Sequence, residues 1–275
     1  MTKTKLILIE GIPGSGKSTT AQLTYDILKE MNIGSKLFLE GNLEHPADYD
    51  TVSYFSKDEF TDLKANFKEF ESLLLSIAVE QENGYLIPRY KIGDSKLPDE
   101  LSSTLWNHDL YELPLELHIE LITAKWEQFR DMALNSEETY IFECCFIQNP
   151  VTTGMVKYDA SDEVVMNYIK RLADIIEPLN PVLIYVDQKD LSYSFTKAVQ
   201  ERPKDWSEGF MNYYNHQGYG KRCGAEGLEG TIAVLKARSE LEAKIFEALK
   251  MEKYKIDNSE FDLESYKVEI MGIVK

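Results

Sequence analysis

Cysteine, histidine and long apolar runs are all scarce in this chain of 275 residues. Its three cysteines are too few for a disulfide framework, and no two of them have the spacing of a CxxC motif. The four histidines show no metal-ligand spacing. The apolar run before Glu10 is too short for a signal peptide, and no later run reaches the ~18 residues of a membrane span. We therefore expect a reduced, cytoplasmic protein without a membrane segment.

Basic residues are outnumbered as well. The chain has 30 Lys and Arg against 47 Asp and Glu, which gives a formal charge of −17. A surface this acidic repels the phosphate backbone of nucleic acids and the headgroups of anionic membranes. We therefore expect no nucleic acid and no membrane as a partner. Any phosphate that the protein binds has to meet a local basic pocket.

Short apolar runs alternate with helical patterns along most of the chain. The runs typical of buried parallel strands are 6–9, 36–39, 140–142, 182–186 and 254–257. The main helical patterns between and after them are 17–31, 161–176, 228–249 and a closing stretch to 274. This alternation predicts a single three-layer α/β domain over 1–275, in which helices flank a parallel five-stranded sheet.

Two stretches interrupt the alternation. Apolar side chains recur at helical spacing in both halves of 55–135, so we expect a largely helical insertion there, on the substrate side of the domain. After Arg202 the chain is rich in glycine and aromatic residues until about Gly224. We expect this stretch, 202–224, to be a loop that acts as a lid.

A phosphate-binding pattern follows the first expected strand directly. Residues 11–19 are GIPGSGKST, which matches the P-loop (Walker A) pattern at every defined position. The glycines let successive N–H groups point at phosphate oxygens, and the helix that follows adds its positive end. Lys17 would then reach the β- and γ-phosphates of ATP, and Ser18 would ligate Mg²⁺. The residues expected to bind the nucleotide are Gly11, Ile12, Pro13, Gly14, Ser15, Gly16, Lys17, Ser18 and Thr19.

The P-loop alone leaves the class of nucleotide-binding protein open. The Asn-Lys-x-Asp signature of GTPases is absent. Two strand patterns end in an acid, at Glu143 and at Asp187, but neither has the second acid that an ATPase would need. Glu143 is the first candidate for Mg²⁺, because its apolar and aromatic neighbours would otherwise bury it without compensation. Asp187 is its rival for this role.

On its motif at 11–19 and on its layout, the chain resembles the nucleoside and nucleotide kinase group of P-loop proteins. In the deoxynucleoside kinases of that group, an acid after the second strand takes the proton of the acceptor hydroxyl, and Glu40 stands at that place. The group has another acid at the end of a later strand, where this chain has Glu143. The resemblance also implies a lid that brings an arginine over the phosphates, matched here by Arg202 with Lys197 nearby.

The resulting hypothesis is a kinase that transfers the γ-phosphoryl group of ATP to a hydroxyl or phosphate of a small, nucleoside- or nucleotide-like acceptor. Its catalytic residues would be Lys17, Glu40 and Arg202, and Ser18 and Glu143 would hold Mg²⁺. Its partners would be a nucleoside triphosphate and the acceptor, with a homodimer left open. The alternatives are a kinase of an antibiotic or an activated sugar, and a non-catalytic nucleotide-dependent switch or ATPase.

Several other side chains have both a functional and a structural interpretation. Arg222 is a second lid candidate, and Arg89 either holds the acceptor or forms a plain salt bridge. The pair Cys144-Cys145 follows Glu143, where the kinase group has an arginine, and is typical of reduced core cysteine. The helix patterns predict solvated faces for the other three arginines, Arg130, Arg171 and Arg238.

Overall fold

The computed structural model describes residues 4–93, 95–260 and 263–274. The chain forms two compact units, one of Met1–Glu40 with Thr123–Lys275 and one of Gly41–Ile122. Each unit has a sheet of its own, and each is described by itself. Within the described residues, no helix combines the length and the apolar character that a membrane crossing requires.

The first unit is built on a five-stranded parallel sheet, which confirms the prediction from the alternating pattern. The strands are β1 (Leu6–Gly11), β2 (Ser35–Phe38), β6 (Thr139–Glu143), β7 (Val182–Asp187) and β8 (Glu252–Asp257). Their order across the sheet is β2-β6-β1-β7-β8. Because parallel strands end at the same edge of a sheet, the residues that follow β1, β2 and β6 meet there.

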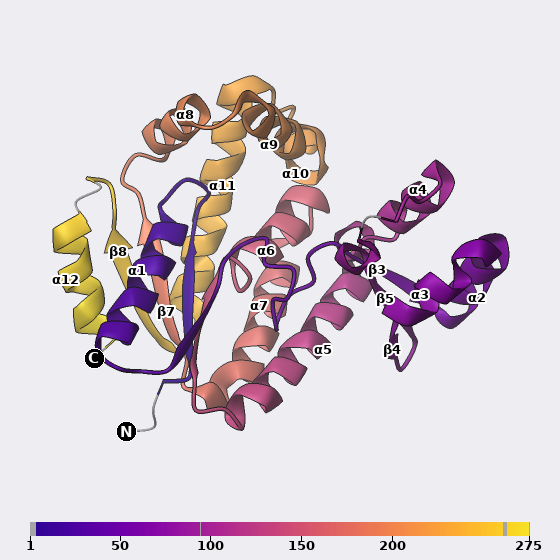
Figure 1. Ribbon diagram of the computed structural model, residues 1–275. Helices are drawn as coiled ribbons and strands as arrows, with labels where there is room; N and C mark the ends of the chain where they lie inside the picture. Colours follow the sequence, from indigo (N-terminus) through magenta and orange to yellow (C-terminus); the bar gives the residue numbers. More distant parts are fainter. Residues whose placement is uncertain (1–3, 94, 261–262, 275) are drawn as a thin grey trace. The chain divides into compact units, whose positions relative to one another are not determined.

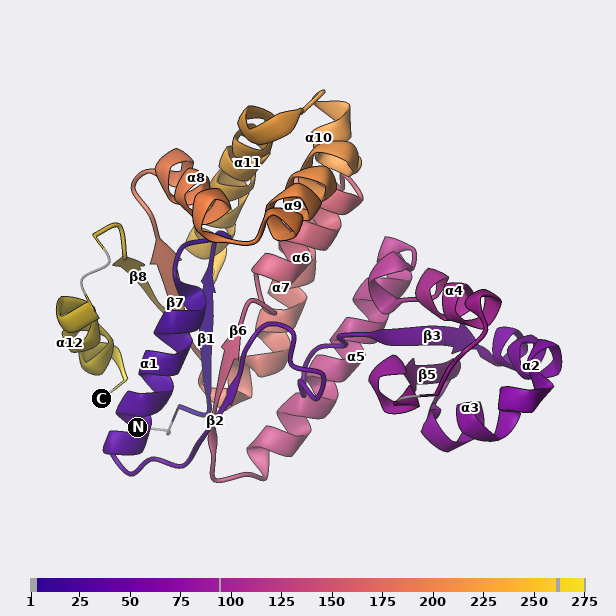
Figure 2. The same cartoon turned by 45° about the horizontal axis from the view of Figure 1, so that its top comes forward.

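Helices flank this sheet on both faces, so the unit has three layers (Figures 1 and 2). On one face, Ala21 and Ile27 of α1 (Lys17–Glu30) and Ile270 of α12 (Leu263–Ile273) join the apolar side chains of the sheet in one core cluster. The opposite face is covered by the C-terminal part of α5 (Leu115–Leu134), by α7 (Asp162–Ile176) and by α11 (Gly227–Ala248).

The expected lid loop at 202–224 is helical instead. It consists mainly of α9 (Lys204–His216) and α10 (Gly218–Arg222). Trp206, Phe210 and Tyr214 recur every four residues and form one aromatic row along α9, in which the rings of Phe210 and Tyr214 are stacked. Gly220 serves close packing, because a Cβ there would lie 1.9 Å from the carbonyl oxygen of Tyr214. The glycine and aromatic content that suggested a loop therefore belongs to packed helices.

Shorter elements complete the first unit. They are α6 (Gln148–Val151), the π-helix η4 (Thr152–Lys157), η5 (Glu177–Leu179) and α8 (Leu191–Glu201). α6 follows β6 after a sharp turn, in which Cys144 adopts a left-handed conformation with a φ of 72°. α8 ends at Glu201, directly before Arg202.

The stretch 55–135 is largely helical, as expected, but the second unit also contains an antiparallel sheet that the sequence did not indicate. The strands, in the order β3-β5-β4, are β3 (Val52–Ser56), β5 (Gly84–Pro88) and β4 (Val79–Gln81). The helices are α2 (Lys57–Asn66), η1 (Lys68–Phe70), α3 (Glu71–Ile77), η2 (Arg89–Ile92), α4 (Asp99–Asn107) and η3 (Leu110–Glu112).

Local signals explain why only the helices of this unit were predicted. Ser56 and Glu59 form a reciprocal capping box that starts α2. The helical apolar spacing continues through Phe60 and Leu63, whose side chains pack against Ile87 of β5. The strands are short and pair over a long stretch of chain, so the periodicity of the neighbouring helices masks them.

A substitution at Phe142 tests how much the core between β6 and α5 contributes to stability. Its side chain is fully buried, and its ring contacts those of Trp126 at 5.9 Å and Phe129 at 4.6 Å. Phe142→Ala should lower the free energy of unfolding by about 3–5 kcal/mol, because it leaves a cavity that the rigid sheet cannot close. Urea titration followed by near-UV circular dichroism measures this. Met132→Ala, at a side chain that is 45% exposed, is the control and should change stability by about 0.5 kcal/mol or less. Equal losses for the two variants would contradict this account of the core.

Candidate active site

The loop between β1 and α1 has a conformation that depends on glycine. Gly16, at the start of α1, has a φ of 99°, and a Cβ there would lie 2.3 Å from the side-chain nitrogen of Asn258. The backbone carbonyl of Ser15 accepts hydrogen bonds from Asn258 at 2.8 Å and from Gln188 at 3.1 Å. The segments that follow β7 and β8 therefore hold the loop in place.

Three features of this loop fit a bound polyphosphate. The Lys17 side chain folds back over the loop and donates a hydrogen bond to the carbonyl oxygen of Ile12 at 3.0 Å. The hydroxyl of Ser15 is buried and has no hydrogen-bond partner among the described residues. No side chain in the described part of the chain caps the N-terminus of α1, which leaves its N–H groups and positive end available to an anion.

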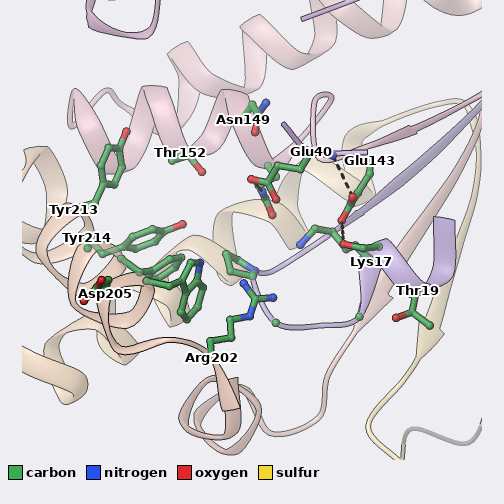
Figure 3. Close-up of a pocket in the computed structure, with 18 residues that line it drawn as sticks. Lys17, Thr19, Glu40, Glu143, Asn149, Thr152, Arg202, Asp205, Tyr213 and Tyr214 are labelled. Carbon is green, nitrogen blue, oxygen red and sulfur yellow. Dashed lines mark hydrogen bonds between the residues drawn. The ribbon is translucent and has the colours of Figure 1, made fainter. Parts of the chain in front are cut away.

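The loop lines a cavity of about 690 Å³ (Figure 3). Most of the residues predicted for the site line this cavity, namely Pro13, Gly14, Gly16, Lys17, Ser18, Thr19, Glu40, Glu143 and Arg202. Gly11, Ile12 and Ser15 belong to the loop without lining the cavity. The other walls come from α6 and η4, with Gln148, Asn149 and Thr152, and from α9, with Asp205, Trp206, Gly209, Phe210, Tyr213 and Tyr214.

Two carboxylates meet beside the loop. The Ser18 hydroxyl donates to one oxygen of Glu143 at 2.6 Å, and the backbone N–H of Glu40 donates to the other at 3.2 Å. The Glu40 carboxylate in turn accepts from the side-chain nitrogen of Gln148 at 3.1 Å and from the thiol of Cys144 at 3.5 Å. Figure 3 shows the Glu40 side chain pointing into the cavity. Glu40 is therefore the exposed acid of the pair, and Glu143 is the buried one.

The donor set fits a hard divalent cation such as Mg²⁺, which prefers oxygen ligands. The hydroxyl of Ser18 and the carboxylate of Glu143 lie within hydrogen-bonding distance of each other and both line the cavity. Asp187, the rival candidate, forms an ion pair with Lys255 at 3.0 Å and does not line the cavity. The geometry therefore favours Glu143 over Asp187.

Cys144 has a partner that the sequence did not indicate. Its thiol is buried, as expected for a reduced core cysteine, but it also contacts the carboxylate of Glu40. Burial raises the pKa of this thiol well above its usual value, Lys17 offsets part of the shift, and the nearby acids raise the pKa again. Cys144 is therefore a protonated donor to Glu40 and has no thiolate character at neutral pH.

Arg202 is the cation that the lid segment places at the cavity. Its guanidinium stacks over the ring of Trp206, at 4.3 Å from the ring centroid, and Figure 3 shows it directed toward the loop. The other predicted lid cations lie outside the cavity lining. Arg222 forms an ion pair with Asp159, and Lys197 lies on α8.

The expectation that Arg238 lies on a solvated helix face is wrong. Its side chain is fully buried. It donates to Glu242 at 2.6 Å, to the hydroxyl of Thr152 at 2.9 Å and to the hydroxyl of Tyr214. It also reaches the backbone carbonyl of Gln148 at 3.3 Å. This network ties α11 to both walls of the cavity. The one signal for it in the sequence is an acid four residues after the arginine.

A second buried acid, Glu10, supports the turn after β6. Its two carboxylate oxygens accept the backbone N–H groups of Phe146 at 2.7 Å and Gln148 at 2.9 Å. Burial raises the pKa of Glu10 to about 7, and the hydrogen bonds from the turn offset part of this shift. Glu10 was not singled out from the sequence, where it is the last residue before the P-loop pattern.

No protein-family model matches this chain, and neither does any curated protein. The functional assignment therefore depends on the motif and on the geometry of the cavity.

Glu10 makes stability depend on pH. Its pKa is higher in the folded state than the usual value of 4.5, so the folded state holds this proton more tightly than the unfolded state does. That contribution is complete below pH 4.5 and is lost as the pH rises through about 7. Relative to Glu10→Gln, the wild type should therefore lose on the order of 3 kcal/mol of unfolding free energy between pH 4.5 and pH 8. Denaturant titrations of both proteins across this range measure the difference, and parallel stability curves would contradict it.

Proposed function

We propose that the protein is a P-loop kinase that transfers the γ-phosphoryl group of ATP to a hydroxyl or phosphate of a small, nucleoside- or nucleotide-like acceptor. The observation that carries this proposal is the cavity that joins the P-loop to an exposed carboxylate. Lys17 and Ser18 lie at one end of it, and Glu40 and Arg202 also line it. A site that only binds nucleotide needs the loop, whereas the carboxylate and the additional wall favour a second substrate.

Each residue has a distinct part in the proposed reaction. The loop amides and Lys17 hold the β- and γ-phosphates, and Ser18 and Glu143 would ligate Mg²⁺. A metal held by these two residues would supply charge neutralisation for the phosphates. For a hydroxyl acceptor, Glu40 orients the hydroxyl and takes its proton as the oxygen bonds to the γ-phosphorus, while the bond to the bridging oxygen of ADP breaks. Arg202 stabilises the charge that spreads over the transferring group.

Packing around Glu40 supports the role of a positioned base. Its two donors, Gln148 and Cys144, both follow β6, so the carboxylate is held from the strand next to its own. Phosphoryl transfer depends mainly on positioning and charge stabilisation, and a carboxylate held in this way meets that requirement.

Lys17→Ala tests whether the loop serves catalysis. We expect phosphate transfer to fall by about 10³-fold, because the ammonium that stabilises the transferring phosphate is lost. A screen of Mg-ATP with pooled nucleosides, nucleotides, sugars and aminoglycosides, read by mass spectrometry, detects products heavier by one phosphate. Lys29→Ala, at the exposed end of the same helix, is the control and should retain activity. Unchanged transfer by Lys17→Ala would refute the proposed reaction.

Glu40→Gln separates a catalyst from a nucleotide-dependent switch. Loss of the base should lower kcat by about 100-fold or more while the affinity for ATP stays the same. Isothermal titration with ATP and a turnover assay on the same samples measure the two quantities. Glu44→Gln, at an exposed acid a few residues along, is the control. If both affinity and turnover survive in Glu40→Gln, Glu40 is not the base.

A further inference from the structure

Arginine is rare in this chain, and all six arginines lie among the described residues. A guanidinium fork binds two oxygens of a phosphate at once, so arginine is the residue that phosphate recognition commonly uses. Of the six, Arg202 alone lines the cavity. The position of each arginine therefore bears on the kind of acceptor that the cavity takes.

The other five arginines are engaged elsewhere or lie outside the cavity. Arg89, in the second unit, is bound by Asp109 and stacks on Trp106, so of its two interpretations the salt bridge is confirmed. Arg238 is neutralised by Glu242 in the interior of the first unit. The three that remain outside the cavity lining are Arg130, Arg171 and Arg222.

The wall of the cavity away from the P-loop has no cation among its described residues. It is formed by Asn149 and Thr152 on one side and by Tyr213 and Tyr214 on the other (Figure 3). Asp205 adds a negative charge on α9. Among the described residues, the cations that line the cavity are Lys17, which belongs to the loop at 11–19, and Arg202, which Figure 3 shows directed toward that loop.

Gln148 is a second, independent indication of the kind of acceptor that the cavity takes. Its side-chain nitrogen donates to Glu40, while its side-chain oxygen is buried and has no hydrogen-bond partner among the described residues. That oxygen calls for an O–H or N–H donor. A phosphate group placed there would offer oxygen acceptors instead, and it would bring like charge to the carboxylate of Glu40.

We infer that the acceptor is a hydroxyl compound without a phosphate group, either uncharged or positively charged. The inference rests on the proposed function and narrows its acceptor class. The acceptor oxygen bonds to the γ-phosphorus as the bond to the β–γ bridging oxygen breaks, Glu40 takes the hydroxyl proton, and ADP leaves. A second hydroxyl or an amine of the acceptor meets the free oxygen of Gln148. The acidic and aromatic wall admits an amine and disfavours a phosphate.

The test offers matched acceptors, in which each hydroxyl compound is paired with its own phosphate ester. The pairs are nucleosides with nucleoside monophosphates, and hexoses and hexosamines with their phosphate esters. We expect kcat/KM for the preferred phosphate-free compound to exceed that for its ester by on the order of 100-fold. Equal or better use of an ester would overturn the inference and leave the proposed kinase reaction intact.

When no transfer is seen, a binding measurement distinguishes failure of the proposed kinase reaction from failure of the inferred acceptor class. Trp206 lines the cavity, so the fluorescence change that is lost in Trp206→Phe reports binding there. With a non-hydrolysable ATP analogue present, phosphate-free compounds should produce this change at lower concentration than their esters. Binding without transfer to any compound contradicts the kinase, whereas tighter binding of esters contradicts the acceptor class.

A charge substitution tests whether the charge of the cavity wall causes the preference for phosphate-free acceptors. Asp205→Arg places a cation in the cavity lining and should raise the use of phosphate esters by about tenfold relative to phosphate-free acceptors. Glu208→Arg, on the same helix but outside the lining, makes the same change in net charge and is the control. An equal gain in both variants would assign the selectivity to overall charge and overturn the role of the cavity wall.

Discussion

The arrangement of the site depends on the carboxylate of Glu143, which binds both the loop and the second acid. β6 lies between β1 and β2 in the sheet, so the acid at its end reaches Ser18 on one side and the backbone of Glu40 on the other. At 3% exposed, this acid would be costly to bury without those two donors. The bonds that make its burial tolerable also fix the loop and the second acid relative to each other. One edge of a parallel sheet thereby brings together side chains from three distant stretches of sequence.

Behind this edge lie charged groups that a stability argument alone would not place there. Glu10 and the ion pair of Arg238 with Glu242 are completely buried, and such groups often add less stability than apolar side chains of the same size. Their contribution is to fix the positions of the segments that line the cavity. Glu10 binds the turn that leads to Gln148, and Arg238 binds the hydroxyl of Tyr214 on the opposite wall. The shape of the cavity is therefore set by polar bonds with fixed directions, which apolar packing alone does not provide.

The parts of this structure that could be predicted from the sequence are those with a local signal. The apolar strands, the GIPGSGKST loop and the acids at strand ends each occupy a few adjacent residues. The helix α9 had such a signal in the spacing of Trp206, Phe210 and Tyr214, but its glycine favoured a loop. The acid four residues after Arg238 was a local signal for their ion pair, but the burial of that pair could not have been predicted, because the partner Thr152 lies 86 positions away and only the packing of α11 brings them together. The strands of the second unit were missed for the same reason, since pairing across a long stretch of chain leaves no local pattern.

In an acidic protein, a polyphosphate site requires positive potential that is confined to a small space. Under the proposed function, the loop at 11–19 would supply it with backbone N–H groups and a helix end, which attract an anion without adding net charge, and with the single ammonium of Lys17. A second phosphate on the acceptor would need a second set of such groups. The far wall instead offers amide, hydroxyl and phenol groups, and Arg238 behind it is already neutralised by Glu242. The distribution of charge within the cavity thus matches one polyphosphate at the loop and a phosphate-free partner opposite it.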